Sequence, residues 1–224
     1  MTAYIKSATG QRWLIVMVCA GLLIFILSLS TLMVPYSTTI EERGGKDLTC
    51  LQIPFTPARA ADIINSYDSE ARAAARRLHL PGDLIFPVGY ALLYSGLIGL
   101  LIRRQEGRWL HVGLMVMLLP FIAMVLDWIE NAFILRMLAI ASQQSVEAIP
   151  AWMPALGGIA GALKYLFLSL LTPLFGLALI VWSLATRTPA LTLGLAVTYL
   201  VAFAMLGFSL FQLFTEIPPC LGSI

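Results

Sequence analysis

The sequence predicts an all-α protein of the membrane class: a polytopic bundle of five transmembrane helices with a short outward-facing helical cap. Two observations of composition support this class. Of the 224 residues, 59% are hydrophobic and only 12% are charged, whereas soluble domains carry about 25% charged residues. The mean hydropathy is +0.88. The length favours a single membrane domain, residues 1–224, over two domains.

Five apolar runs are long enough to cross a hydrocarbon core, which needs about 20 residues. The first exceeds the ~7–15 apolar residues of a signal-peptide core, which favours a retained helix over a cleaved signal. We expect Pro81-Gly82 to end one helix, Asp83 to cap the second span, and Pro120 and Pro173 to kink later spans. The predicted spans are Trp13–Val34, Leu84–Ile102, Leu110–Ala132, Ile159–Ala185 and Ala190–Phe214.

The one long segment between spans, residues 35–82, is predicted to face outward. It begins with an expected loop, Ser37–Thr49. Thr56 and Pro57 then have the pattern of a helix start, with threonine as the N-cap and proline at the first helical position. The helix-favouring run that follows, with a break near Ser66–Ser69, predicts one or two short helices on the outer end of the bundle. A lid or peptide-binding role is the alternative.

Lysine and arginine are denser on the N-terminal side of the predicted bundle. The short segments there hold six basic residues and one acid, whereas the longer segments opposite hold eight basic and eleven acidic residues. The positive-inside rule places the N-terminus in the cytoplasm and the C-terminus in the periplasm or extracellular space. We therefore expect a multi-pass protein of the plasma membrane, specifically the bacterial inner membrane.

Ionisable side chains interrupt the third predicted span. Asp127, Glu130 and Asn131 have the i, i+3, i+4 spacing that places side chains on one helix face. A helix rises ~1.5 Å per residue, so the distance from the start of the span places Asp127 just inside the outer edge of a ~30 Å hydrocarbon core. The same count places Lys164 at that depth, and charges in a bilayer tend to pair or to line a pathway. We expect one polar layer, which also includes Asp83, Tyr90 and Tyr165.

The sequence leaves the function of this layer open. An intramembrane acid–base enzyme, an isomerase, cyclase or hydrolase of a lipid or isoprenoid-like substrate, would use Asp127 and Glu130 as catalytic residues, because acids in different surroundings titrate differently. The same residues also fit a proton-coupled carrier, or a purely structural Asp127–Lys164 ion pair. The interpretation we favour is binding of a lipid-like or hydrophobic small molecule, with ligand-binding residues Asp83, Tyr90, Asn131, Lys164 and Tyr165.

Further expectations concern partners, metals and cysteines. Membrane lipids are the expected partners, and no basic run with interleaved aromatic residues points to nucleic acid. Without a CxxC, HExxH or histidine cluster we expect no metal and no cofactor. Cys50 and Cys220 predict a disulfide on the outer side, with two free thiols as the alternative. Gly157-x-x-x-Gly161 predicts close helix packing, with a homo-oligomer interface as the alternative.

In three motifs the chain resembles a group of small uncharacterised bacterial five-span integral membrane proteins. The resemblance covers about residues 56–164 and implies a five-helix layout with no established activity. A weaker likeness to membrane sterol isomerases and their ligand-binding relatives carries no residue over, because their His/Glu arrangement has no match in this chain. The three motifs are D-L-I-F-P at 83–87 followed by Tyr90, D-x-x-E-N at 127–131, and Leu163-Lys164.

Overall fold

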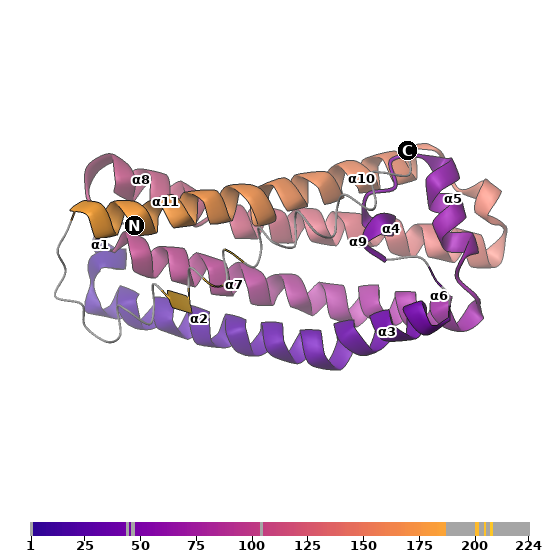
Figure 1. The fold of residues 1–224 in the computed structure, drawn as a ribbon, viewed down its shortest axis with the longest axis horizontal. Helices are drawn as coiled ribbons and strands as arrows, with labels where there is room; N and C mark the ends of the chain where they lie inside the picture. The colour runs from indigo at the N-terminus through magenta and orange to yellow at the C-terminus, as the bar shows by residue number, and fades with distance from the viewer. Residues whose placement is uncertain are drawn as a thin grey trace.

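Helices make up the fold, and the longest of them run side by side along the molecule (Figure 1). The computed structural model describes residues 2–43, 45, 48–103, 105–186, 200, 201, 204 and 207. Within these residues there is no β-strand. The elements are α1 (Thr2–Lys6), α2 (Ala8–Ser28), the π-helical turn η1 (Leu29–Met33), α3 (Val34–Glu42), α4 (Leu48–Gln52), α5 (Pro57–Asn65), α6 (Ser69–Arg77), the π-helical turn η2 (Leu78–Gly82), α7 (Asp83–Ile102), α8 (Gly107–Val116), α9 (Leu119–Gln143), the 3₁₀ turn η3 (Val146–Ala148), α10 (Trp152–Tyr165), the π-helical turn η4 (Leu166–Leu171) and α11 (Thr172–Thr186).

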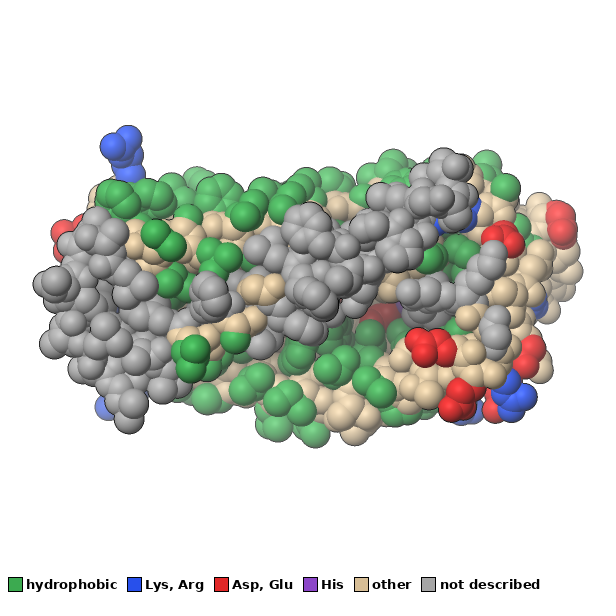
Figure 2. Space-filling model, in the orientation of Figure 1, with side chains coloured by type: hydrophobic (Ala, Val, Ile, Leu, Met, Phe, Trp, Pro, Cys, Tyr) green, Lys and Arg blue, Asp and Glu red, His purple; other side chains and the backbone are tan. Residues whose placement is uncertain are grey.

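Four helical stretches of the described chain are long and apolar enough to cross a membrane. Their outer faces are apolar too: Trp13, Leu23 and Met115 are each more than half exposed. Soluble monomers rarely expose large continuous apolar surfaces. Figure 2 shows charged side chains gathered at the two ends of the molecule, with hydrophobic ones between them. The four stretches are Ala8–Glu42, Ser69–Ile102, Gly107–Gln143 and Trp152–Trp182.

The structure corrects two predicted helix boundaries and does not test one predicted span. The predicted loop Ser37–Thr49 is wrong over its first part, because η1 and α3 continue the first stretch as far as Glu42. The predicted helix end at Pro81-Gly82 is also wrong, because the wider π-helical turn η2 carries the helix past a proline that lacks an N–H. Asp83 therefore lies within a continuous helix. The fifth predicted span, residues 190–214, lies almost entirely outside the described residues and stays a prediction.

Within residues 35–82, α3 and α6 are the ends of two long stretches. Of the described helices in this segment, α4 and α5 are the short separate ones. The predicted start of α5 is confirmed: Pro57 is its first residue, and Thr56 Oγ1 accepts a hydrogen bond from the backbone N–H three residues later at 3.3 Å. The predicted break near Ser66–Ser69 is confirmed as well. This end of the bundle has an apolar core that joins α5 and α6 to α9, formed by Ile63, Ile64, Tyr67, Ala71, Ala74, Ala75, Ile134, Met137 and Leu138 among others.

Helices α2 and α7 approach each other at glycine positions. A Cβ at Gly21 would lie 2.4 Å from the backbone nitrogen of Leu93, and one at Gly89 would lie 2.8 Å from that of Phe25. Small residues permit such close approach between membrane helices. A second apolar core around Tyr90 lies next to this contact, toward the N-terminal end of the molecule from the first core.

Prolines coincide with the interruptions of the later stretches, as predicted. Residues 117 and 118 separate α8 from α9, of which Pro120 is the second residue. The carbonyl oxygen of Met117, in this break, accepts a hydrogen bond from Ser95 Oγ at 2.7 Å. Near Pro173, the turn η4 precedes α11, and Thr172 Oγ1 donates to the carbonyl of Phe167 at 2.6 Å. Neighbouring hydroxyls thus satisfy backbone groups where the helical pattern is broken.

Candidate functional site

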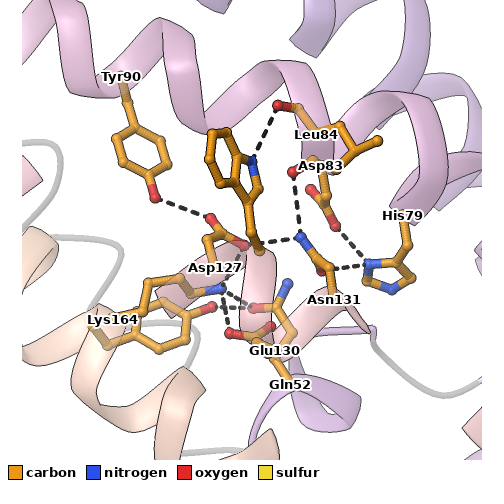
Figure 3. Close-up of polar contacts among 11 residues, drawn as sticks. Gln52, His79, Asp83, Leu84, Tyr90, Asp127, Glu130, Asn131 and Lys164 are labelled. Atoms are coloured by element: carbon orange, nitrogen blue, oxygen red, sulfur yellow. Dashed lines mark hydrogen bonds and ion pairs between the residues drawn. The ribbon is translucent and has the colours of Figure 1, made fainter. Parts of the chain in front are cut away.

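The polar residues of α9 are buried together. Asp127, Glu130 and Asn131 are 4%, 0% and 1% exposed. They lie along α9 between Ala123, which belongs to the apolar core around Tyr90, and Ile134, which belongs to the core that joins α5 and α6 to α9. Their spacing directs all three side chains to the interior, as predicted, and Figure 3 shows them between α7 and α10. Because buried polar groups are costly unless they are paired, their partners define the site.

Lys164 of α10 is the counter-charge, at the depth that counting residues predicted. Its Nζ lies 2.8 Å from Glu130 Oε2 and 3.5 Å from Asp127 Oδ1. Lys164 also donates to Gln52 Oε1 at 3.2 Å, and it is 5% exposed. One ammonium is therefore shared by two carboxylates, and the closer of these is Glu130 rather than the Asp127 expected from the sequence.

Asp127 is held mainly by neutral donors. The hydroxyl of Tyr90 donates to Asp127 Oδ2 at 3.1 Å, and Asn131 Nδ2 donates to Asp127 Oδ1 at 3.1 Å. These bonds come from α7 and from the helix of Asp127 itself (Figure 3). These two neutral donors are closer to the carboxylate than the ammonium of Lys164 at 3.5 Å.

Asn131 compensates for a hydrogen bond that Pro87 removes from the neighbouring helix. Proline has no N–H, so the carbonyl of Asp83, four residues earlier, lacks its usual helical donor. Asn131 Nδ2 donates to this carbonyl oxygen at 3.3 Å. One turn away, Trp128 Nε1 donates to the carbonyl of Leu84 at 3.2 Å. Side chains of α9 therefore satisfy the backbone of α7 at the position where a proline opens it.

His79 adds a second buried ionisable pair. Its Nδ1 lies 2.6 Å from Asp83 Oδ2 and 2.9 Å from Asn131 Oδ1. Both of these atoms are acceptors, so we assign the proton to Nδ1. His79 is not among the residues expected in this layer from the sequence, and a helix that ended at Pro81-Gly82 would separate it from Asp83. The turn η2 instead makes His79 and Asp83 neighbours one helical turn apart.

Gln52 of α4 is the second residue that sequence reasoning missed. Its Oε1 accepts hydrogen bonds from Tyr165 Oη at 2.6 Å and from Lys164 Nζ at 3.2 Å. The available signal was a single amide within the otherwise apolar run Leu51–Phe55. Gly161 allows α4 to approach, because a Cβ there would lie 2.4 Å from the Gln52 carbonyl oxygen. This glycine serves the predicted close packing within the chain.

A cavity of about 210 Å³ opens onto the polar layer. Glu130 and His79 are not among the residues that line it; they lie behind Lys164 and Asp83. Residues from η1 and η4 contribute to its wall, and π-helical turns are frequent at functional sites. The polar lining consists of Thr49, Gln52, Asp83, Tyr90, Tyr94, Asp127, Lys164, Tyr165 and Ser169, and the apolar lining consists of Phe25, Leu29, Met33, Phe86 and Leu168.

The predicted site residues of α7, α9 and α10 therefore lie in one layer. Cys19 is free and exposed, and it forms no disulfide with Cys50. Cys220 lies outside the described residues, so its bridge to Cys50 stays a prediction. Within the described part of the chain, no cluster of three or more His, Cys, Asp and Glu side chains could hold a metal ion.

Comparison of the chain with protein-family models, curated proteins and solved structures gives no match. The class of protein follows from the fold: four long apolar helices in the described part of the chain fit an α-helical integral membrane protein. Its distinguishing feature is a buried layer of three carboxylates, one lysine and one histidine that faces a cavity.

Proposed function

We propose that the protein binds a small lipid-like or amphiphilic molecule in this cavity. The observation that carries the proposal is that one cavity has both an apolar wall and a buried charged end. Phe25, Leu29 and Phe86 lie on the apolar side, whereas Asp127 and Lys164 lie on the polar side. Ligand sites typically combine a mostly apolar lining with a few converging polar groups. A molecule with an apolar body and a polar head group fits both parts.

The size of the cavity limits what it can enclose. A volume of about 210 Å³ is below the roughly 300–1,000 Å³ of sites that enclose a drug-sized ligand. The head group and the first carbons of an amphiphile fit within it. The rest of an acyl or isoprenoid-like chain would extend into the surrounding lipid.

The proposed topology places the cavity in the outer half of the membrane. Lys6, Arg12, Arg103 and Arg108 belong to the end of the molecule that holds the N-terminus, and the polar layer lies toward the opposite end (Figure 1). Short segments rich in lysine and arginine stay in the cytoplasm. This distribution supports a cytoplasmic N-terminus and a ligand taken from the outer leaflet.

An intramembrane acid–base enzyme is the second candidate function. It is favoured by the convergence of Tyr90 and Lys164 on Asp127 at the cavity, because both side chains lie within hydrogen-bonding distance of its carboxylate. In that case Asp127 is the catalytic acid or base that reaches the substrate. Glu130, which lies behind Lys164, then acts as a positioning residue rather than the second catalytic acid that the sequence suggested.

Filling the cavity tests the binding function. Ser169 lines the cavity and is buried, so Ser169→Phe should occupy its volume. Ala162, on α10, is exposed, and Ala162→Phe is the matched control. Lipids that co-purify with each protein in detergent are extracted with organic solvent and quantified by mass spectrometry. We expect one class of molecule near stoichiometric amounts in the wild type and the control, and at least tenfold less in Ser169→Phe. Equal lipid content in all three folded proteins would contradict the proposal.

A further inference from the structure

We propose that the cavity selects a cationic amphiphile, a primary ammonium group on a short apolar body, and that Asp127 binds the ammonium. This inference rests on the proposed binding function and names the chemistry of its ligand. It depends on three observations: the balance of buried charge, the distribution of that charge between the cavity and the packed interior, and the aromatic wall.

The described residues of the layer hold more acids than bases. Asp83, Asp127 and Glu130 are each at most 4% exposed, and they face one lysine ammonium and one imidazole. Even with a protonated His79, the ionised carboxylates exceed the cations by one. A buried charge without a partner is strongly unfavourable. When all three acids are ionised, the layer therefore attracts one more positive group.

The three carboxylates differ in how well they are paired. Glu130 has the ammonium of Lys164 at 2.8 Å and does not line the cavity. Asp83 has the imidazole of His79 at 2.6 Å. Asp127 has its nearest cation at 3.5 Å and otherwise accepts from a phenol and an amide. Asp127 thus has the longest of the three contacts to a basic side chain, and a ligand in the cavity can reach it.

The wall of the cavity also suits an organic cation. Phe25 and Phe86 pack at a tilt of 34° with ring centroids 4.9 Å apart, and Phe86 meets Tyr90 edge to face at 5.8 Å. Aromatic faces attract ammonium groups through cation–π interactions. An anionic head group would instead approach Asp127 and Asp83. It would gain little from Lys164, whose ammonium already contacts two carboxylates and an amide oxygen.

A matched series of eight-carbon amphiphiles tests the charge preference. Octylamine, octanol and octanoate are titrated at pH 7.5 into the purified full-length protein in detergent micelles, with empty micelles as the blank, by isothermal titration calorimetry. We expect octylamine to bind at least tenfold more tightly than octanol, and octanoate to bind more weakly than both. Equal affinities of the amine and the alcohol would overturn the charge preference and leave the binding function standing. No saturable binding of any of the three would overturn both.

Two variants assign the preference to one carboxylate. In Asp127→Asn the amine-to-alcohol ratio should fall to within twofold, because the amide has no charge to pair with the ammonium. Glu147→Gln removes an exposed acid outside the cavity and should keep the tenfold ratio. A ratio that persists in Asp127→Asn, or that is lost in Glu147→Gln, would show that Asp127 is not the binding partner. The wild-type series stands on its own if the Asp127 variant does not fold.

Discussion

Replacing Lys164 by methionine tests whether the polar layer is held together by charge pairing. Methionine keeps the length of the apolar stem but leaves Glu130 and Asp127 without the ammonium at 2.8 and 3.5 Å. Removing one partner of a buried ion pair costs about 3–5 kcal/mol. For a chain of this size each kcal/mol shifts the melting temperature by roughly 2–4 °C. We therefore expect Lys164→Met to melt about 10 °C below the wild type.

Thermal unfolding in detergent, followed by circular dichroism at the helical signal, measures this change. Lys6→Met is the matched control, because Lys6 is exposed and its partner Glu106 lies 3.9 Å away. Exposed ion pairs contribute about 0–1 kcal/mol, so this control should melt close to the wild type. The comparison separates the loss of a buried charge from the loss of a lysine as such.

A second substitution tests the physical cause of the loss. Adding Glu130→Gln to Lys164→Met removes the closest uncompensated carboxylate, and most of the lost stability should return. Replacing both members of a buried pair is far less costly than replacing one. A single variant as stable as the wild type would refute the pairing, and so would a double variant no more stable than Lys164→Met.

Two further predictions concern the packing around the site. Asn131→Leu should lower the free energy of unfolding by about 2–3 kcal/mol, because it leaves buried groups unsatisfied. The loss should be smaller in a Pro87→Ala background, where alanine returns an N–H to the Asp83 carbonyl. A double-mutant cycle on thermal unfolding that shows no coupling between the two positions would contradict this. Gly161→Ala should lower the free energy of unfolding by about 1–3 kcal/mol, since its Cβ would lie 2.4 Å from a carbonyl oxygen of α4. Gly82→Ala is the control and should change stability little, because the atom nearest to its Cβ would be 3.4 Å away. Equal melting temperatures of these two variants would count against the contact.

The location of the site could be predicted from the sequence because a membrane limits the possible arrangements. Helical periodicity placed Asp127, Glu130 and Asn131 on one face, and a fixed rise per residue gave their depth. Because spans start and end at the same two interfaces, the depth of Lys164 could be compared with that of Asp127. The contacts at 2.8 and 3.5 Å show that this comparison brought the right helices together.

The residues that were missed depend on features that periodicity does not describe. Pro81-Gly82 is a typical helix end in soluble proteins, but here η2 continues the helix and brings His79 into the layer. Gln52 lies on a short helix whose position is set by contacts with α10, not by a local pattern. Both misses arise where tertiary contacts satisfy backbone or polar groups that local rules treat as unsatisfied.

The polar layer is difficult to explain by stability alone. It lies between two apolar cores, and apolar residues of similar volume in its place would join these cores. Replacing buried ion pairs by well-packed apolar residues is often neutral or stabilising. Three buried carboxylates therefore carry a cost that an apolar layer would avoid, and two of them, Asp83 and Asp127, line the cavity. A costly group that faces a cavity is better explained by binding than by packing, which is why we propose that a ligand binds at Asp127.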